Sequence, residues 1–555
     1  MERIGKLLFV LGLTAAPISA LAQVVTQNDF VITVDAARQI PVLTGISVQA
    51  GRTLTFTASG TWCMGGTPPT AECGPPSGIR PANAEELPLI LDTAQIGTLI
   101  GRVASGPWFK IGAGGSIKMP NSGTLALLFN DRPCCFGDNS GSVTVKMKLA
   151  TERMSVSSRG SQGNGNSSGS SISRYGHYVA FGSDATNLVP RDTNGSRDIF
   201  FHNRETGVTR RVSVSSSGNQ ANSFSLESAI SEDGQYVAFS SYASNLVPGD
   251  ANGSADIFVH NRSTGVTRRV SVSTGGGQSD SGSSQPAISP NGRYVAFEST
   301  ASNLVPGDTN GEPDIFVHDR ATGVTQRVSV SSSGEQGDGD SQSPTISSNG
   351  RYVAFISFST NLVPNDSNEF FYDVFVHDRV AGTTQRVSVN SSGSEGNASS
   401  SEPSISADGR YVAFQSNAGN LVADDTNGAT DIFLHDRTTG ITSRMSVNST
   451  GQQGNSSSGD PAISADGLAV TFSSAASNLV SSDTNGKGDV FVHGRETGIT
   501  RRVSLASGGT QGNNHSVFPA ISSYGRYITF SSEATNLVPG DTNSVIDVFV
   551  RDRGP

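Results

Sequence analysis

Short strands that are apolar on both faces recur at a fixed interval through the C-terminal three-quarters of the chain. The segment DIFVHDR, or a near copy, occurs seven times at steps of 58 residues, with one step of 59. A second apolar segment, such as GRYVAF at 292–297, lies about twenty residues before each copy. The copies span residues 197–204, 255–262, 313–320, 372–379, 430–437, 488–495 and 546–553. A fixed repeat of this length predicts an array of similar structural units.

Each repeat predicts four short strands. A strand ending in Ile-Ser precedes an Asp-Gly or Asn-Gly turn, the YVAF strand, a longer loop and the DIFV strand. A Thr-Gly turn then leads into an alternating strand such as residues 324–330. Strands with two apolar faces need cover on both sides, which neighbouring blades of a β-propeller provide. The repeat therefore predicts a seven-bladed β-propeller over residues 151–555.

The two ends of the repeat region predict that the ring is closed. The last copy stops at Arg553 and lacks its final alternating strand, whereas an unpaired strand of that type stands at 152–158. This N-terminal strand can complete the last blade, and closure removes the exposed sheet edges that invite aggregation.

The repeated motifs resemble those of the PD40, or TolB-like, family of WD40-type β-propellers. The resemblance rests on S-x-D-G-R-Y-V-A-F and D-I-F-V-H-D-R-x-T-G over about 400 residues. It implies the architecture and says little about function, because such propellers carry many different roles.

Residues 23–150 carry no copy of the repeat and predict a separate β-sandwich. Alternating apolar positions, divided by Gly and Pro, predict its strands. These are residues 32–34, 45–48, 53–60, 98–103, 124–129 and 142–149. The fold class is therefore all-β, with an N-terminal β-sandwich followed by the closed propeller.

Residues 1–22 have the pattern of a secretory signal peptide. Arg3 and Lys6 precede a short apolar run at 7–13, and small residues end at Ala22. The run is too short to cross a bilayer core of ~30 Å. We expect cleavage near Ala22 and export to the periplasm or the exterior, with no membrane span.

The net charge bears on which partners the protein binds, and the cysteine content bears on whether it forms disulfides. The net charge is -10 without a basic stripe, which disfavours nucleic acid as a partner. All four cysteines, Cys63, Cys73, Cys134 and Cys135, precede residue 150. An even number of cysteines in an exported protein predicts disulfides, and three pairings are open.

Acidic loops between the second and third strands of the repeats are candidate Ca²⁺ sites. Their D-x-N-G-x-x-D pattern places three oxygen-bearing side chains in one turn, and Ca²⁺ takes six to eight oxygens. The alternative is that the same residues only build the turn. The sets are Asp192/Asn194/Asp198, Asp250/Asn252/Asp256, Asp308/Asn310/Asp314, Asp366/Asn368/Asp373, Asp425/Asn427/Asp431, Asp483/Asn485/Asp489 and Asp541/Asn543/Asp547.

A histidine recurs on the third predicted strand of six repeats. These residues are His202, His260, His318, His377, His435 and His493. Equivalent residues in successive blades indicate a shared packing role between blades rather than a catalytic site, which is normally built once.

The N-terminal region resembles the PA-IL-like family of bacterial galactose-binding lectins. The resemblance covers about 100 residues and includes A-S-G-x-W at 58–62, G-T-L-I-G at 97–101 and the Gly-rich loop within NDRPCCFGDNSGSVTV at 130–145. It implies a small β-sandwich that binds sugar hydroxyls on a loop-held Ca²⁺. Asp131, Asp138 and Asn139 would then be side-chain ligands of the ion, and Asp131 and Asp138 would also lie at the sugar.

Further ligands carried over from the resemblance are the backbone carbonyls of Cys135 and Met64. Asp138 replaces the family's Asn, and a second carboxylate strengthens a cation site. The family's sugar-contacting His and Gln have no counterpart in residues 78–90, so galactose specificity does not carry over. Cys63 and Cys134 adjoin the two carbonyl donors, which suggests that a disulfide holds the site together.

These observations favour a secreted, calcium-dependent carbohydrate-binding or adhesion protein. Its partner would be a carbohydrate or cell-surface glycan, and the propeller would be a scaffold for a second partner such as a protein. One alternative is an extracellular structural or assembly protein without sugar binding. Another is a propeller polysaccharide lyase or hydrolase. We expect no enzyme, because the sequence has no HExxH and no residue set that departs from the sevenfold pattern.

Overall fold

The structure is a computed structural model that divides the chain into two compact units, residues 1–147 and 148–555. It describes residues 151–554 except 369 and 370, together with strand segments between residues 24 and 148. The predicted signal peptide lies outside the described residues. Within the described part, no helix is long and apolar enough to cross a bilayer.

The first unit has two sheets, which contact each other through β2 and β9. One sheet has the order β1-β2-β10-β4-β5, with β8 also paired to β4, and the other has the order β3-β9-β6-β7. Leu99 and Ile100 of β6 and Leu127 and Leu128 of β9 are buried. The strands are β1 (Val24–Val25), β2 (Asp29–Asp35), β3 (Val42–Val48), β4 (Thr53–Met64), β5 (Glu72–Gly74), β6 (Leu99–Val103), β7 (Phe109–Lys110), β8 (Gly114–Lys118), β9 (Gly123–Phe129) and β10 (Ser140–Lys148).

The register of β4 and β5 bears on the disulfide pairing. Cys63 lies directly opposite Cys73 in this antiparallel pair. Opposed residues in such a pair have Cα atoms ~4.5–5.5 Å apart, within the span of a disulfide. The backbone register therefore keeps a Cys63–Cys73 pairing open. Cys134 and Cys135, including the predicted bond to Cys134, lie outside the described residues.

The second unit contains seven four-stranded sheets in the residues that the structure describes. Six of them follow the chain order from first to fourth strand. They are β12 (Ser167–Ile172), β13 (Tyr178–Ser183), β14 (Asp198–Asn203), β15 (Val208–Arg211); β16 (Ser225–Ile230), β17 (Tyr236–Ser241), β18 (Asp256–Asn261), β19 (Thr267–Arg269); β20 (Ser283–Ile288), β21 (Tyr294–Ser299), β22 (Asp314–Asp319), β23 (Val324–Arg327); β24 (Ser341–Ile346), β25 (Tyr352–Ser357), β26 (Asp373–Asp378), β27 (Thr383–Arg386); β28 (Ser400–Ile405), β29 (Tyr411–Ser416), β30 (Asp431–Asp436), β31 (Ile441–Arg444); and β32 (Ser458–Ile463), β33 (Ala469–Ser474), β34 (Asp489–Gly494), β35 (Thr500–Arg502).

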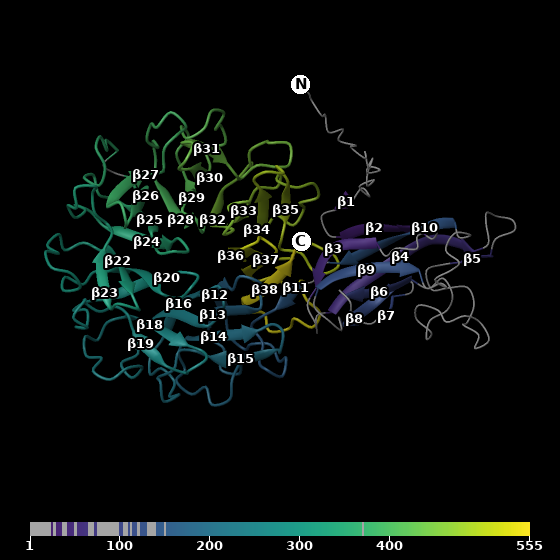
Figure 1. Cartoon of the computed structure of the whole chain (residues 1–555), viewed down its shortest axis with the longest axis horizontal. Coiled ribbons are helices and arrows are strands. Elements are labelled where there is room, and N and C mark those ends of the chain that lie inside the picture. Colours follow the sequence, from purple (N-terminus) through teal and green to yellow (C-terminus); the bar gives the residue numbers. More distant parts are fainter. Residues whose placement is uncertain are drawn as a thin grey trace, which may run out of the picture. The chain divides into compact units, whose positions relative to one another are not determined.

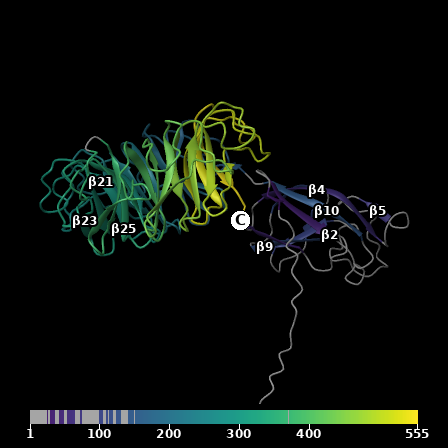
Figure 2. The same cartoon turned by 90° about the horizontal axis from the view of Figure 1, so that it is seen from above.

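The sheets stand side by side around a common axis, with the first strand of each sheet innermost (Figures 1 and 2). Phe239 and Phe258 stack across β17 and β18, with ring centroids 5.9 Å apart. Both also pack in one buried cluster with Ile199 and Phe201 of the preceding sheet. Apolar residues on both faces of YVAF and DIFV thus fill the spaces between neighbouring sheets, and the predicted all-β propeller is confirmed.

The ring is closed by the strand that the sequence predicted. β11 (Thr151–Arg153) pairs antiparallel with β38 (Asp547–Asp552), which continues through β37 (Tyr527–Ser532) to β36 (Ser516–Ile521). β12 in turn contacts β36 and β37. The last sheet therefore takes three strands from the C-terminal end and one from the start of the unit.

The closing segment also brings the polar groups that the last sheet needs. Arg153 lies 3.0 Å from a carboxylate oxygen of Asp541 and 3.5 Å from one of Asp547. The hydroxyl of Ser155 donates to the other oxygen of Asp547. These side chains are almost fully buried, so the two carboxylates depend on Arg153 for their charge partner.

The recurring histidines connect each sheet to the one before it. His435 Nδ1 lies 2.9 Å from Thr442 Oγ1, and the Thr442 hydroxyl donates to the Val389 carbonyl of the preceding repeat. Because the hydroxyl proton is used in that bond, the imidazole N–H is on Nδ1. The same pair is formed by His202–Thr209, His260–Thr267, His318–Thr325, His377–Thr384 and His493–Thr500. This arrangement agrees with the packing role expected for these histidines.

Replacing Arg153 by Ala should destabilise the propeller more than a surface change does. The substitution leaves Asp541 and Asp547 buried without their cation, a loss that typically costs ~3–5 kcal/mol. Chemical unfolding of the full chain, followed by circular dichroism, measures the change. Arg159→Ala, at an exposed residue near the same strand, is the matched control. Equal stability of the two variants would contradict the role of Arg153.

The stability contributed by His435 should disappear as the pH falls. Burial lowers the pKa of His435 from 6.5 to about 4. The unfolded chain therefore takes up a proton at this residue below pH ~6.5, whereas the folded chain does so only near pH 4. The contribution is fully present above pH ~6.5 and is lost as the pH falls through that window.

The measurement is the difference in free energy of unfolding between the wild type and His435→Gln. We expect this difference to shrink by ~3 kcal/mol between pH 7.5 and 4. Taking a difference removes the contribution of other titrating groups. A pH-independent difference for His435→Gln would contradict a buried neutral imidazole.

Candidate functional site

The seven acidic loops, expected either to bind calcium or to build a turn, each hold one arginine. In the third sheet, Arg327 Nη1 lies 3.1 Å from both Asp308 and Asp314. The other oxygen of Asp314 accepts a hydrogen bond from Ser329. The guanidinium thus lies between the two carboxylates that a cation would need.

The same arrangement occurs in every sheet. An arginine from the fourth strand lies within 3.7 Å of both loop carboxylates. The sets are Arg211 with Asp192 and Asp198, Arg269 with Asp250 and Asp256, Arg386 with Asp366 and Asp373, Arg444 with Asp425 and Asp431, Arg502 with Asp483 and Asp489, and Arg153 with Asp541 and Asp547. In the fourth loop Glu395 joins the group at 2.7 Å from Arg386.

The loop asparagines build turns. The Asn427 amide nitrogen donates to Asp431 at 2.9 Å and to the Gly454 carbonyl at 3.0 Å. Its oxygen accepts from the backbone N–H of Ala429, two residues later. Asn194, Asn252, Asn310, Asn368, Asn485 and Asn543 likewise donate to a backbone carbonyl. In five of the seven loops the amide oxygen accepts a backbone N–H within the turn, and in all seven the carboxylates lie beside an arginine, so the turn interpretation accounts for these contacts. Calcium binding by these loops stays a prediction.

In the first and third loops, burial changes the pKa of the second carboxylate. Asp198 and Asp314 are fully buried, and burial raises the pKa of each to about 6. The arginine and the serine hydroxyl act in the opposite direction by favouring the ionised form. Burial thus disfavours the ionised form of these two carboxylates, and the arginine and the serine hydroxyl counteract it.

The calcium ligands implied for the lectin-like region fall mainly on residues that the structure does not describe. Asp131, Cys135, Asp138 and Asn139 lie outside the described residues. Met64 is the last residue of β4, and β10 begins at Ser140, immediately after the loop. Since β10 and β4 are neighbours in one sheet, the chain topology places the strand of Met64 beside the strand that follows the loop.

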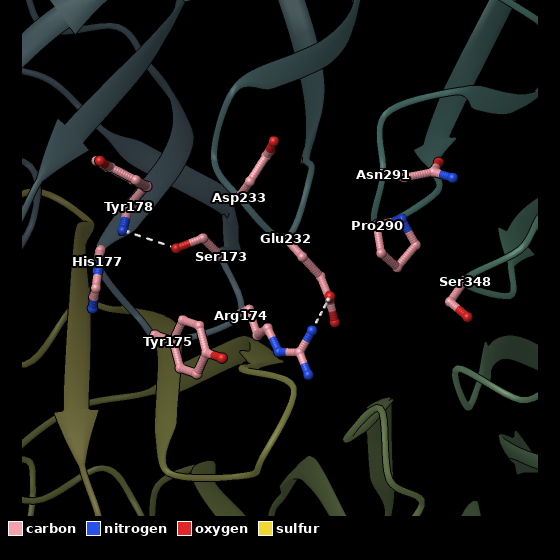
Figure 3. Close-up of a pocket in the computed structure, with 10 residues that line it drawn as sticks. All are labelled: Ser173, Arg174, Tyr175, His177, Tyr178, Glu232, Asp233, Pro290, Asn291 and Ser348. Atoms are coloured by element: carbon pink, nitrogen blue, oxygen red, sulfur yellow. Dashed lines mark hydrogen bonds and ion pairs between the residues drawn. The ribbon is translucent and has the colours of Figure 1, made fainter. Parts of the chain in front are cut away.

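A cavity that sequence reasoning missed lies among the turns that join the first and second strands of neighbouring sheets (Figure 3). It has a volume of about 420 Å³ and is lined by Arg174, Tyr175, Glu232, Pro290 and Ser348, among other residues. These residues belong to the turns between the first and second strands of successive sheets, called axial turns here. The axial turns are residues 173–177, 231–235, 289–293, 347–351, 406–410, 464–468 and 522–526.

The axial turns are not equivalent, and the expectation that no residue set departs from the sevenfold pattern is wrong. Five turns have Asp or Asn at the third position, but Tyr175 and Tyr524 occupy it in the first and last turns. Arg174 and Glu232 precede that position in two turns, where the other five have Pro, Ser or Ala. Aligning the turns on their shared Ser and Gly would have exposed the departure.

Comparisons with known proteins identify the two units separately. The family model described as "PA-IL-like protein" matches residues 29–152. Lectin A of Photorhabdus laumondii subsp. laumondii is 36% identical over 105 residues, which make up 19% of this chain and 78% of that protein.

Solved structures similar to this chain are β-propellers. TolB from Acinetobacter baumannii is 14% identical with a TM-score of 0.34, and the match covers 60% of this chain and 62% of that one. The β-propeller domain of the Trilobed protease from Pyrococcus furiosus is 10% identical with a TM-score of 0.43, and the match covers 70% and 96%. Through residues 29–152, the chain belongs to the PA-IL-like protein family.

Proposed function

We propose that the protein is a secreted, calcium-dependent carbohydrate-binding protein in which the propeller is a scaffold for a second partner. The observation that carries the proposal is the family match over residues 29–152 and the 36% identity to a protein named lectin A. The identity extends over 78% of that lectin, so the region corresponds to most of a lectin chain.

The donor set expected in this region fits Ca²⁺. Asp131, Asp138 and Asn139 would supply three side-chain oxygens, and Met64 and Cys135 would supply two backbone carbonyls. Hard oxygen donors, two of them carboxylates, are what Ca²⁺ selects, and it takes six to eight in all. When bound, the ion would supply a Lewis-acidic centre on which sugar hydroxyls can complete the coordination.

Binding rather than catalysis is the role that we propose for the whole chain. In the described part, the recurring histidines are used in His–Thr pairs within each sheet and the loop carboxylates in ion pairs with arginine. Single sugar sites usually bind weakly, so a second binding surface on the propeller would increase the overall affinity through avidity.

Asp131→Ala should abolish calcium-dependent glycan binding, because it removes a carboxylate ligand from the proposed site. A glycan array, probed with the full chain in calcium and again in EDTA, measures the effect. Asp184→Ala, at an exposed residue of the propeller, is the control and should retain binding. Undiminished calcium-dependent binding by Asp131→Ala would reject the assigned site.

Calcium should stabilise only the N-terminal unit. Calorimetry of the EDTA-treated chain should show one transition that moves up on calcium addition, because a site at 100-fold saturation gains ~2.7 kcal/mol. In Asp131→Ala this shift should vanish. The propeller transition should stay unchanged in both proteins, since arginine already neutralises its acidic loops. A calcium-dependent shift of the propeller transition would restore the calcium interpretation of those loops.

A further inference from the structure

Five of the seven axial turns share one local arrangement. The Ser231 hydroxyl donates to Asp233 at 2.5 Å, and the same carboxylate oxygen accepts from the backbone N–H of Gln235 at 2.8 Å. Equivalent bonds are made at Asn291, Asn349, Asp408 and Asp466. An Asp or Asn side chain that bonds its own backbone is a standard way to fix a tight turn.

Tyr175 and Tyr524 give up this arrangement in two turns that are neighbours in the closed ring. Their rings lie 5.9 Å apart between centroids, and each side chain is 53% exposed. Neither ring is needed to fill a core, because the sheets beneath are packed by Tyr178, Tyr527 and the buried Phe residues. Because these two tyrosines replace the Asp or Asn that fixes the other turns, without a gain in core packing, we interpret their positions as functional.

Charged groups hold this aromatic pair in place. The Arg174 guanidinium lies 5.5 Å from the Tyr175 ring centroid and 5.0 Å from that of Tyr524, and it donates to the Tyr524 hydroxyl. Its other end donates to Glu232 at 3.2 Å. The Ser523 hydroxyl donates to the second oxygen of Glu232 at 2.5 Å. Three axial turns are thereby tied into one network of planar polar groups beside exposed aromatic rings.

The cavity lies where the bonds between neighbouring axial turns are interrupted. The backbone N–H of Arg174 donates to Glu232, and that of Glu232 donates to Pro290. Pro290 has no N–H, so the series stops there and begins again at Ser348, which donates to Ala407. Figure 3 shows Pro290 and Ser348 on one side and Arg174, Tyr175 and Glu232 on the other. The volume of about 420 Å³ falls within the ~300–1,000 Å³ of small-molecule sites.

We propose that this cavity is a second binding site, specific for a neutral saccharide and independent of calcium. A sugar ring has an apolar C–H face and a rim of hydroxyls, so it matches an exposed tyrosine ring flanked by donors and acceptors. Arg174 supplies donors, and Glu232 supplies acceptors. Since the charge of Arg174 is already paired with Glu232, and Asp233 lies at the same cavity, an anionic sugar finds no free cation there.

The experiment uses the full chain with Asp131→Ala, in EDTA, so that the lectin-like site of the proposed function does not contribute. Its probes are neutral cello-, malto- and galacto-oligosaccharides, with oligogalacturonate as the anionic comparison and a random peptide library as the non-sugar comparison. We expect one neutral series to bind in titration calorimetry and oligogalacturonate to bind at least ~10-fold more weakly.

Site variants then locate the binding. Tyr175→Ala should weaken the Kd of the bound oligosaccharide ~10-fold, the size expected for one aromatic stacking contact, because Tyr175 lines the cavity. Tyr175→Phe, which keeps the ring, should bind within ~3-fold of the parent chain. Tyr242→Ala is the matched control, because Tyr242 is 49% exposed and pairs with Phe224 in another part of the propeller. It should leave the Kd unchanged.

Three results would overturn the proposal. They are no binding of any neutral series, preferential binding of oligogalacturonate or peptide, and an unchanged Kd in Tyr175→Ala. Melting temperatures of all variants, measured in parallel, separate lost binding from lost folding. The outcome is also separate from that of the proposed function, which the calcium-dependent glycan array tests at Asp131.

Discussion

The propeller depends on one short strand, β11, which supplies to the last sheet what every other sheet takes from its own repeat. Thr151 faces Arg551 in the position where the other fourth strands place threonine opposite histidine. Arg153 neutralises the last acidic loop, and Ser155 bonds its buried carboxylate. Thr151, Arg153 and Ser155, at alternate positions, thus supply the hydrogen bond, the ion pair and the hydroxyl contact that the other sheets take from their own repeats. Without them the ring would have an open edge and two uncompensated buried carboxylates.

Repetition made the propeller predictable from the sequence. The apolar pattern of YVAF and DIFV located two strands of each sheet, and the unpaired segment at 152–158 indicated the closure. The strand boundaries agree because each of these turns has a Gly at a constant distance, preceded by Asp, Asn or Tyr before the second strand and mostly by Thr before the fourth. For the N-terminal unit, the fold class followed from alternation, whereas residues 131–139 lie outside the part that the structure describes.

The role of the acidic loops could not be derived from the loops alone. Their spacing is compatible with a cation and with a turn, and the deciding residue is elsewhere. Arg327 lies thirteen residues after Asp314 and meets it only because the third and fourth strands pair. The tyrosine pair was missed for a related reason. Tyr175 and Tyr524 are far apart in the chain and become neighbours through ring closure, so a comparison within single repeats does not reveal them.

The position of β11 also determines how mechanical load would travel through the molecule. The strand lies at the end of the PA-IL-like match in the chain and runs antiparallel to β38, the last strand, so that Thr151 lies opposite Arg551. A pull on the N-terminal region against an anchored C-terminus would therefore act at the same end of both strands and break their hydrogen bonds one after another. The Arg153 ion pairs lie further along the same seam and would oppose the separation of the two strands. Tension between the two ends would therefore be carried by one sheet, and the other six would bear little of it.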